Sequence, residues 1–525
     1  MILFCTCAKK SGMISKIHSA IPYGFDGKIV EVEADMNRGL PAFNIVGMAN
    51  KTINEAKERV RSAIVNSEFN FPDRKVTINL APADLAKDGS YLDLPIALSI
   101  LTLSGNLIAA DTQGRLFVGE LSLDGKVRPI TGIINIVEAA KAANIHEVFL
   151  PARNLSQASL VEGVTLYGVD TLQNLYLQLK QQGSILPTNE NQMRPAPNHN
   201  NNDSASSRKV LLDHIRGQQA AKRALTIAIA GHHNVLIEGP PGAGKTMLAK
   251  AAANLLPDLT SNEMVDVTKI YSLAGMNMDE IICERPFRSP HHTASAASII
   301  GGGTRAVPGE ISLAHRGILF LDEIPEFPRN VLEALRQPLE DKHISISRAN
   351  HKTAYPADFM LIATMNPCPC GYLGDPTHEC TCTEQQIQNY QKKISGPLLD
   401  RIDICVSVDR VKNKFLDTPS EYLQREHSVV KNTITEAIRR QRARYGHDGQ
   451  YNGSLSSFEI SKLVKMNSAA EKLLSAASER LNLSARAYFK TIKVARTIAD
   501  LDGQSLIDAK HIAEALTYRR RQGYK

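Results

Sequence analysis

The feature that most constrains this chain is the octapeptide Gly-Pro-Pro-Gly-Ala-Gly-Lys-Thr at residues 239–246. It fits the pattern G-x-x-x-x-G-K-[S/T], in which glycines let the backbone turn its N–H groups toward phosphate oxygens. The apolar run Val235–Ile237 precedes it, and the helix-forming residues 247–253 follow it. A strand, this loop and a helix N-terminus together form an anion-binding site. The sequence therefore predicts an α/β core built around a nucleotide-binding loop.

A second motif is the run 317–321, which Asp322 and Glu323 follow directly. Its apolar residues predict a buried parallel strand that ends in two carboxylates. We expect Lys245 to contact the β- and γ-phosphates of ATP, while Thr246 and Asp322 bind Mg²⁺. Glu323 is expected to polarise the attacking water. The nucleotide-binding residues are then Gly239, Pro240, Pro241, Gly242, Ala243, Gly244, Lys245, Thr246 and Asp322.

The length of 525 residues suggests two to four domains, and 43% of the residues are hydrophobic. No apolar run approaches ~18 residues, so we expect no membrane span and a cytoplasmic location. The net charge of +7 is compatible with a nucleic-acid partner but is weak evidence for one. We interpret residues 1–12 as a start-site extension or a disordered segment.

The N-terminal region, residues 13–180, mixes strand and helix patterns and predicts an α+β domain. Alternating residues predict the strands, and helical spacing predicts the helices. The strands are expected at 28–34, 75–80 and 147–150, and the helices at 50–66 and 94–103. Residues 181–208, rich in Gln, Asn, Pro and Ser, predict a flexible linker that marks the domain boundary.

Basic and glycine-rich segments flank the second motif. Residues 285–293 and 300–305 are interpreted as a mobile pore loop that contacts a polyanion, with a plain surface insertion as the alternative. Residues 331–340 predict a short amphipathic helix, and residues 343–353 a β-hairpin with a basic tip. The alternative is that the hairpin tip is exposed to solvent and contacts no DNA. The candidate DNA-contacting residues are Arg288, His291, His292, Arg305, Arg348, His351 and Lys352.

The run Phe359–Pro367 predicts another buried strand, and Asn366 at its polar end can orient the attacking water. Four cysteines follow, with the spacing C-x-C, nine residues, C-x-C. Their thiolates could complete a tetrahedral Zn²⁺ site, although C-x-C is tighter than the usual C-x₂₋₄-C. His378 could replace one of the cysteine ligands, and four reduced cysteines without metal are the other alternative. The candidate zinc ligands are Cys368, Cys370, Cys380 and Cys382.

Two arginines complete the candidate catalytic set. Arg401 lies between a short helix and the strand 404–408, where a guanidinium can reach the γ-phosphate on a neighbouring subunit. An internal salt bridge to Asp400 or Asp403 is the alternative. In the helical region that follows, Ser484 is the expected N-cap of a long helix. Arg486 is the candidate contact from the helical lid to the nucleotide, with Lys490 and Arg496 as alternatives.

The segments Ala86–Pro95 and Val127–Gly132 resemble the proteolytic domain of Lon. That family uses a Ser–Lys dyad, but Tyr91 and Ile134 stand at the two matching positions here. Ser90 and Lys141 lie nearby in the sequence, but neither stands at the position that the dyad residue occupies in that family. Without an activated hydroxyl and its base, acyl transfer has no chemistry. The resemblance therefore implies a Lon-like fold without proteolytic activity, which serves assembly or partner binding.

The whole set of motifs, from about residue 14 to 518, resembles the ComM/YifB family of Mg-chelatase-like AAA+ proteins. The resemblance implies an α/β chain with an AAA+ parallel-sheet core at 209–412 and a helical lid at 413–525. It further implies a homohexameric, ATP- and Mg²⁺-dependent motor on single-stranded and branched DNA, with recombination proteins as further partners. Its activity would be branch migration during integration of transforming DNA. A protein remodeller and a chelatase-type metal-insertion motor are the alternatives.

Overall fold

The computed structural model describes residues 14–47, 51–85, 87, 89–180, 210–303, 307–347, 352–375, 378–410, 426–446 and 449–519. The expected N-terminal extension at 1–12 and the expected linker at 181–208 lie outside these residues. The chain divides into two compact units. The first combines the N-terminal residues with Thr260–Cys283, and the second holds most of the remaining chain.

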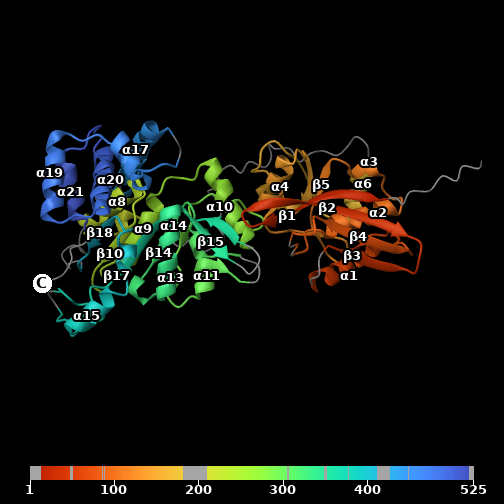
Figure 1. The fold of residues 1–525 in the computed structure, drawn as a ribbon, viewed down its shortest axis with the longest axis horizontal. Coiled ribbons are helices and arrows are strands. Elements are labelled where there is room, and N and C mark those ends of the chain that lie inside the picture. Colours follow the sequence, from red (N-terminus) through yellow and green to blue (C-terminus); the bar gives the residue numbers. More distant parts are fainter. Residues whose placement is uncertain are drawn as a thin grey trace, which may run out of the picture. The chain divides into compact units, whose positions relative to one another are not determined.

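The first unit is built on a seven-stranded sheet of order β3-β4-β2-β1-β5-β8-β9 (Figure 1). β1 and β4 both run antiparallel to β2, whereas the other neighbouring pairs are parallel. The mixed sheet agrees with the α+β pattern of the sequence. The strands are β1 (Ser15–Tyr23), β2 (Asp26–Asn37), β3 (Ala42–Val46), β4 (Lys75–Ala81), β5 (Arg115–Phe117), β8 (Glu147–Pro151) and β9 (Thr165–Val169).

Helices cover both faces of this sheet. Along β1, Ile17 and Ile21 join the core formed with α1 (Lys51–Asn66) and α2 (Asp93–Leu103), while Ala20 joins the core formed with α4 (Ile133–Ala142). Because strand side chains alternate between faces, α1 and α2 lie on one face and α4 on the other. The remaining elements are α3 (Ala109–Thr112), β6 (Glu120–Leu121), β7 (Val127–Arg128), α5 (Leu155–Ala158) and α6 (Leu172–Lys180).

The segment Thr260–Cys283, which the sequence placed inside the ATPase core, packs as part of the first unit. Its helix α10 (Ser261–Leu273) contributes Lys269, which is nearly fully buried and lies 2.5 Å from the Glu138 carboxylate. The Ser272 hydroxyl accepts a hydrogen bond from the Gly132 backbone N–H at 2.9 Å. Tertiary contacts, and not local sequence, place this segment in the first unit, because the bonded residues lie more than 100 positions apart in the chain.

The second unit contains a five-stranded parallel sheet of order β11-β14-β17-β10-β18. Its central strands are continuous apolar runs because helices cover parallel sheets on both faces. The sequence predicted β10, β14, β17 and β18. The strands are β11 (Phe287–Arg288), β14 (Ile318–Leu321), β17 (Met360–Met365), β10 (Val235–Glu238) and β18 (Ile404–Ser407).

The helix expected at 331–340 is instead two short helices, α13 (Arg329–Ala334) and α14 (Arg336–Asp341), which meet at Leu335. Pro338 explains the break because it has no N–H to donate to the carbonyl four residues earlier. The hairpin that follows is present as β15 (His343–Ser347) and β16 (Lys352–Pro356), with antiparallel pairing. Its tip lies outside the described residues.

Beyond the sheet, the C-terminal region forms a helical bundle that packs on α8 (Gln219–Gly231) (Figure 1). Ser484 caps its long helix as expected, since its hydroxyl accepts a hydrogen bond from the Ala487 N–H at 3.2 Å. Among the described residues, no helix is both long and apolar enough to cross a membrane. The bundle consists of α17 (Glu426–Tyr445), α18 (Ser457–Leu463), α19 (Ser468–Arg480), α20 (Ala485–Leu501) and α21 (Ala509–Thr517).

Candidate nucleotide-binding site

The phosphate-loop sequence connects β10, near the middle of the parallel sheet, to helix α9 (Lys245–Leu255). Gly244 is the N-cap of α9 and has φ +84°, a left-handed conformation that favours glycine. The loop thus directs a helix N-terminus and its free N–H groups to the carboxyl edge of the sheet. Ligands of open α/β sheets bind at this edge.

Lys245 joins the loop to the neighbouring strand. Its Nζ donates hydrogen bonds to the Gly239 carbonyl at 2.5 Å and to Oδ1 of Asn366 at 2.7 Å. Asn366 directly follows β17, which is paired with β10. Burial lowers the pKa of Lys245, and the nearby carboxylates of Asp322 and Glu323 oppose this shift. The structure therefore brings together the expected phosphate-binding lysine and the expected water-orienting amide.

The expected Mg²⁺ ligands also meet here. Thr246 Oγ1 lies 3.2 Å from Oδ2 of Asp322, at the carboxyl end of β14. Asp322 Oδ1 accepts a second hydrogen bond from the Thr364 hydroxyl at 2.5 Å. A hydroxyl and a carboxylate provide the hard oxygen donors that Mg²⁺ prefers, so these two residues fit the ion.

Glu323 is exposed and has a left-handed backbone with φ +53°, which is uncommon for a residue with a side chain. Its backbone N–H donates to Thr364 Oγ1 at 3.0 Å. Thr364 therefore fixes both acidic residues at the end of β14, and the sequence analysis did not assign it. The available signal was a polar residue inside the apolar run of β17. Residues with a left-handed backbone like that of Glu323 concentrate at functional sites.

The two expected catalytic arginines converge on a carboxylate that the sequence analysis did not identify. Arg401 Nη2 lies 2.5 Å from Glu340 Oε2, and Arg486 Nη2 lies 2.8 Å from Glu340 Oε1. Only 8% of the Arg401 side chain is exposed, against 43% for Arg486. The internal salt bridge considered for Arg401 thus exists, but with Glu340 rather than Asp400 or Asp403.

Of the expected DNA-contacting residues, Arg288 lies in edge strand β11 and forms two hydrogen bonds of 2.6 Å with Glu310. Arg288 is therefore held by the core rather than by a mobile loop. The His291 and His292 rings lie side by side, with centroids 4.1 Å apart. Neither the side chain of Lys352 nor the positions Arg305, Arg348 and His351 fall among the described residues.

The four expected zinc ligands form one cluster. The sulfur atoms of Cys368, Cys370, Cys380 and Cys382 all lie within 4.8 Å of one another. A backbone hydrogen bond from Tyr372 is the main cause that lowers the pKa of the Cys370 thiol to about 6, whereas burial raises the pKa of the Cys368 thiol, and the pKa values of Cys380 and Cys382 are also raised. A thiolate is the form that binds metals.

In the first unit, the residues of the Lon-like segments have structural partners. The Tyr91 hydroxyl lies 2.7 Å from Thr131 Oγ1, and Ile134 is fully buried. The Ser90 hydroxyl donates to Glu120, and Lys141 Nζ donates to the Glu162 carbonyl at 2.7 Å. Ser90 and Lys141 therefore each bind a residue other than the partner that a Ser–Lys dyad requires.

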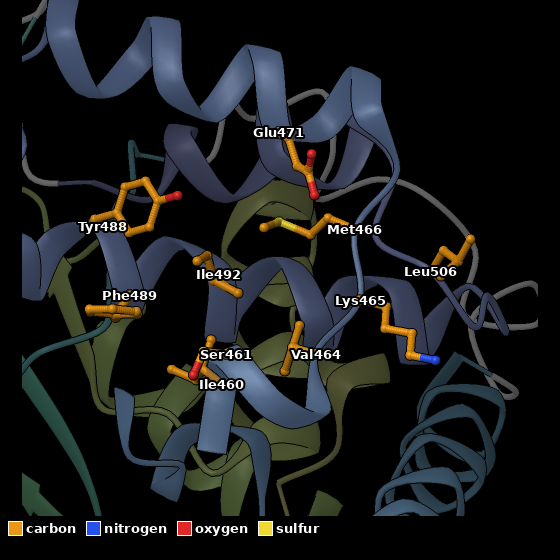
Figure 2. A pocket seen from close by; sticks show the side chains of 10 residues that line it. All are labelled: Ile460, Ser461, Val464, Lys465, Met466, Glu471, Tyr488, Phe489, Ile492 and Leu506. Carbon is orange, nitrogen blue, oxygen red and sulfur yellow. The ribbon is translucent and has the colours of Figure 1, made fainter. Parts of the chain in front are cut away.

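A pocket of about 500 Å³ lies in the C-terminal bundle (Figure 2). Apolar side chains line most of it, and Lys465 and Glu471 add charged groups. None of its lining residues comes from the phosphate loop or from the ends of the parallel strands. The nucleotide-binding geometry described above is therefore separate from this pocket.

Three family models match the chain. "Magnesium chelatase, subunit ChlI" matches residues 211–416, "Subunit ChlI of Mg-chelatase" matches 32–154, and "Magnesium chelatase, subunit ChlI C-terminal" matches 424–519. Together with the parallel sheet, the phosphate loop and the C-terminal helices, these matches define a Mg-chelatase-like AAA+ protein. This class implies ATPase activity that uses ATP and Mg²⁺.

Similar full-length proteins narrow the class. The chain is 42% identical to Competence protein ComM of Haemophilus influenzae, over 96% of this chain and 97% of that protein. It is 39% identical to the uncharacterized protein YifB of Escherichia coli, with the same coverage. By contrast, a magnesium-chelatase 67 kDa subunit of Chlorobaculum parvum is 25% identical over 29% of this chain and 23% of its own length. The chain belongs to the ComM/YifB family, as its motifs predicted.

Proposed function

We propose that this chain is an ATP-driven DNA motor that assembles as a homohexameric ring and promotes branch migration during integration of transforming DNA. The observation that carries the proposal is the convergence of Lys245, Asn366, Thr246 and Asp322 at one sheet edge, in a chain similar to a competence protein along nearly its whole length. The convergence of these four residues supports ATP hydrolysis, and the similarity to a competence protein supports a DNA substrate.

In this mechanism, Lys245 and the N-terminus of α9 hold the phosphates. Thr246 and Asp322 hold Mg²⁺, which neutralises charge on the phosphate oxygens when bound. Glu323 accepts a proton from the attacking water, and Asn366 orients that water. Thr364 holds the Asp322 side chain and the Glu323 backbone, because its hydroxyl hydrogen-bonds to both.

Arg401 supplies positive charge to the γ-phosphate bound by a neighbouring subunit, and Arg486 assists from the lid. Arginine is suited to this because its guanidinium remains charged and spreads over several donors. Both arginines bind Glu340 within one chain, so this carboxylate orients their guanidinium groups for the phosphate. The requirement for a neighbour is the main support for the ring.

DNA contacts are proposed at the tip of the β15–β16 hairpin, with Arg348, His351 and Lys352, and at Arg305, His291 and His292. These side chains offer positive charge or hydrogen-bond donors to a phosphate backbone. Arg288 is better regarded as a structural residue, because Glu310 engages its guanidinium. The Lon-like N-terminal domain is proposed to be proteolytically inactive, since Tyr91 and Ile134 occupy the dyad positions.

For the cysteine cluster we propose a structural Zn²⁺ ion. Four zinc–sulfur bonds of about 2.3 Å in a tetrahedron place the sulfur atoms about 3.8 Å apart. The sulfur pairs Cys368–Cys370, Cys368–Cys380 and Cys370–Cys380 lie at 3.3, 3.6 and 3.6 Å. Small outward shifts of the side chains would therefore admit the ion.

The experiment that tests the motor is ATP-driven branch migration of a labelled three-strand or four-way DNA junction. Wild-type protein should move the junction, and the Glu323→Gln variant should bind DNA without moving it. No movement by the wild type, combined with an ATPase rate indifferent to DNA, would overturn the proposal.

The second candidate is a chelatase-type motor, favoured by the matched family models. A protein remodeller recruited through the N-terminal domain is the third. The effect of DNA on the ATPase rate separates them, because neither alternative requires stimulation by DNA. Stimulation by a porphyrin-binding partner or by an unfolded protein would favour the respective alternative.

A further inference from the structure

The cysteine cluster is joined directly to the nucleotide-binding site. β17 ends at Met365, Asn366 follows it, and Cys368 lies two residues further along. Asn366 accepts the hydrogen bond from Lys245, and Cys368 is fully buried among the other sulfur atoms. Any change in the position of Cys368 is therefore transmitted to Asn366 through a single intervening proline.

A second contact connects the cysteine loop to the phosphate loop itself. Gly371 follows Cys370 and has φ +87°, and a Cβ atom placed on it would lie 2.6 Å from Cδ of Pro241. That added atom would also lie 3.9 Å from Cγ of Asn366. Only glycine allows the two loops to approach so closely. The cysteine loop thus packs against both the phosphate loop and the water-orienting amide.

Helix α15 (Glu384–Gln391), which begins just after Cys382, holds the same strand end from its other side. Gln391 Nε2 donates to the Pro367 carbonyl at 3.1 Å. The hydroxyl of the buried Tyr390 forms a hydrogen bond with the backbone of Asn366. The start of the cysteine loop at Gly371 and the helix that follows the second C-x-C pair therefore both contact the segment 366–367.

The cluster has the hydrogen bonds expected around metal-bound sulfur. The Cys370 N–H donates to Cys382 Sγ at 3.3 Å, and the Leu373 N–H donates to Cys368 Sγ at 3.3 Å. Backbone N–H groups that point at sulfur orient the ligands and stabilise their negative charge.

We infer that Zn²⁺ bound by the four cysteines positions Asn366 and Pro241, so that ATP binding and hydrolysis depend on an intact zinc site. This inference rests on the proposed zinc ligation and on ATP binding, but not on the proposed DNA motor. The ion would join Cys368 and Cys370 to Cys380 and Cys382. Without this link, Asn366 and the phosphate loop lose their fixed relation. The zinc site is then a positioning element for the nucleotide site.

The test compares the full-length wild type with the variants Cys380→Ser and Cys382→Ser, which change two cysteines that, unlike Cys368, are only partly buried. Cys283→Ser is the matched control, because Cys283 is an exposed cysteine outside the cluster. Zinc is measured by elemental analysis, and affinity for a fluorescent ATP analogue is measured in excess Mg²⁺. The wild type and the control should carry about one zinc per chain, whereas the variants lose it and bind the nucleotide about tenfold or more weakly.

A second variant separates the contact from the metal. Gly371→Ala keeps all four cysteines but forces Pro241 and the loop apart. It should retain zinc and still weaken nucleotide binding, whereas a site that merely staples a surface loop predicts unchanged affinity. Far-ultraviolet circular dichroism checks that each variant is folded.

Two results would overturn the inference: a wild type purified without chelators that holds no zinc, or zinc-free variants that bind the nucleotide with wild-type affinity. Neither measurement uses DNA. A failed branch-migration assay therefore leaves this inference standing, and the reverse also holds.

Discussion

The guanidinium of Arg401 lies 2.5 Å from a carboxylate oxygen of Glu340, although 61 positions separate the two residues in the sequence. The same carboxylate binds Arg486 at 2.8 Å. Burial would raise the pKa of Glu340, but hydrogen bonds from the two arginines lower it, so the carboxylate stays ionised at neutral pH. Glu340 therefore sets the orientation of both proposed catalytic arginines.

The first prediction concerns this carboxylate. Glu340→Gln should lower the kcat for ATP by about tenfold or more, because an arginine without its fixed orientation supplies less transition-state charge. The KM for ATP should change little, since the phosphate loop is intact. Steady-state ATPase kinetics measure both. Glu333→Gln is the control, because Glu333 forms an ion pair of similar length, 2.7 Å, but with Arg336 instead of the proposed catalytic arginines. Equal effects of the two substitutions would remove Glu340 from the mechanism.

The second prediction tests action between subunits. Arg401→Ala and Glu323→Gln should each lose nearly all ATPase activity as pure proteins. In a 1:1 mixture, about a quarter of sites pair an intact Glu323 with an intact Arg401 from the neighbour, so activity should reappear. The mixture must be denatured and refolded together, or coexpressed, so that the subunits exchange. Persistent inactivity of verified mixed rings would show that Arg401 acts within its own chain.

The third prediction concerns the helical bundle. Asp500 is fully buried and binds Arg496 at 2.9 Å, Arg444 at 3.0 Å and the Asn452 amide at 2.9 Å. Asp500→Ala should destabilise the bundle by about 3–5 kcal/mol, because it leaves buried guanidinium groups without their counter-charge. The measurement is the thermal unfolding midpoint, combined with hydrogen exchange in α17 and α20.

The control for that measurement is Asp502→Ala, two residues further along the chain. Asp502 is a third exposed, and its partners Lys510, His511 and Arg223 lie at 3.2, 3.4 and 3.7 Å, so the loss of this solvated carboxylate should cost about 1 kcal/mol. If the two variants unfold alike, the buried network does not stabilise the bundle.

The fourth prediction is a pH dependence in the first unit. Burial raises the pKa of Asp93 from 3.8 to about 6, even though Arg59 binds its carboxylate at 2.8 Å. The folded carboxyl thus holds its proton more tightly than the unfolded one, and protonation adds stability as the pH falls through about 6 toward 4. This contribution is absent above pH 7. Asp93→Asn cannot gain it, so the stability of the wild type relative to this variant should rise between pH 7 and pH 5. A constant difference in melting temperature over that range would show an unshifted pKa.

Local patterns in the sequence predicted much of the nucleotide site. The phosphate loop, the strand ending in Asp322 and Glu323, and the strand ending in Asn366 are each contiguous segments whose residue order requires their structure. The N-cap at Ser484 was predictable for the same reason, because a cap depends on residues within one helical turn. The hairpin at β15 and β16 follows from alternation and a polar turn.

The prediction of one helix at 331–340 was wrong. The amphipathic pattern favoured a continuous helix, but Pro338 lacks the N–H that such a helix needs. The assignment of 260–283 to the ATPase core followed from chain order alone. Its packing on the first unit depends on contacts such as Lys269 with Glu138, whose side chains no local pattern relates.

By itself, the sequence predicted the chemical groups of this protein: a loop for phosphates, two carboxylates at the end of a strand, four clustered cysteines, and membership of a family. Only the tertiary structure decided which distant residues control those groups. Thr364 reaches Asp322 and Glu323 because β17 pairs with β14, and Glu340 reaches Arg401 and Arg486 because three separate segments meet. Short-range order is encoded in neighbouring residues, whereas such contacts depend on how strands and helices pack across long stretches of chain.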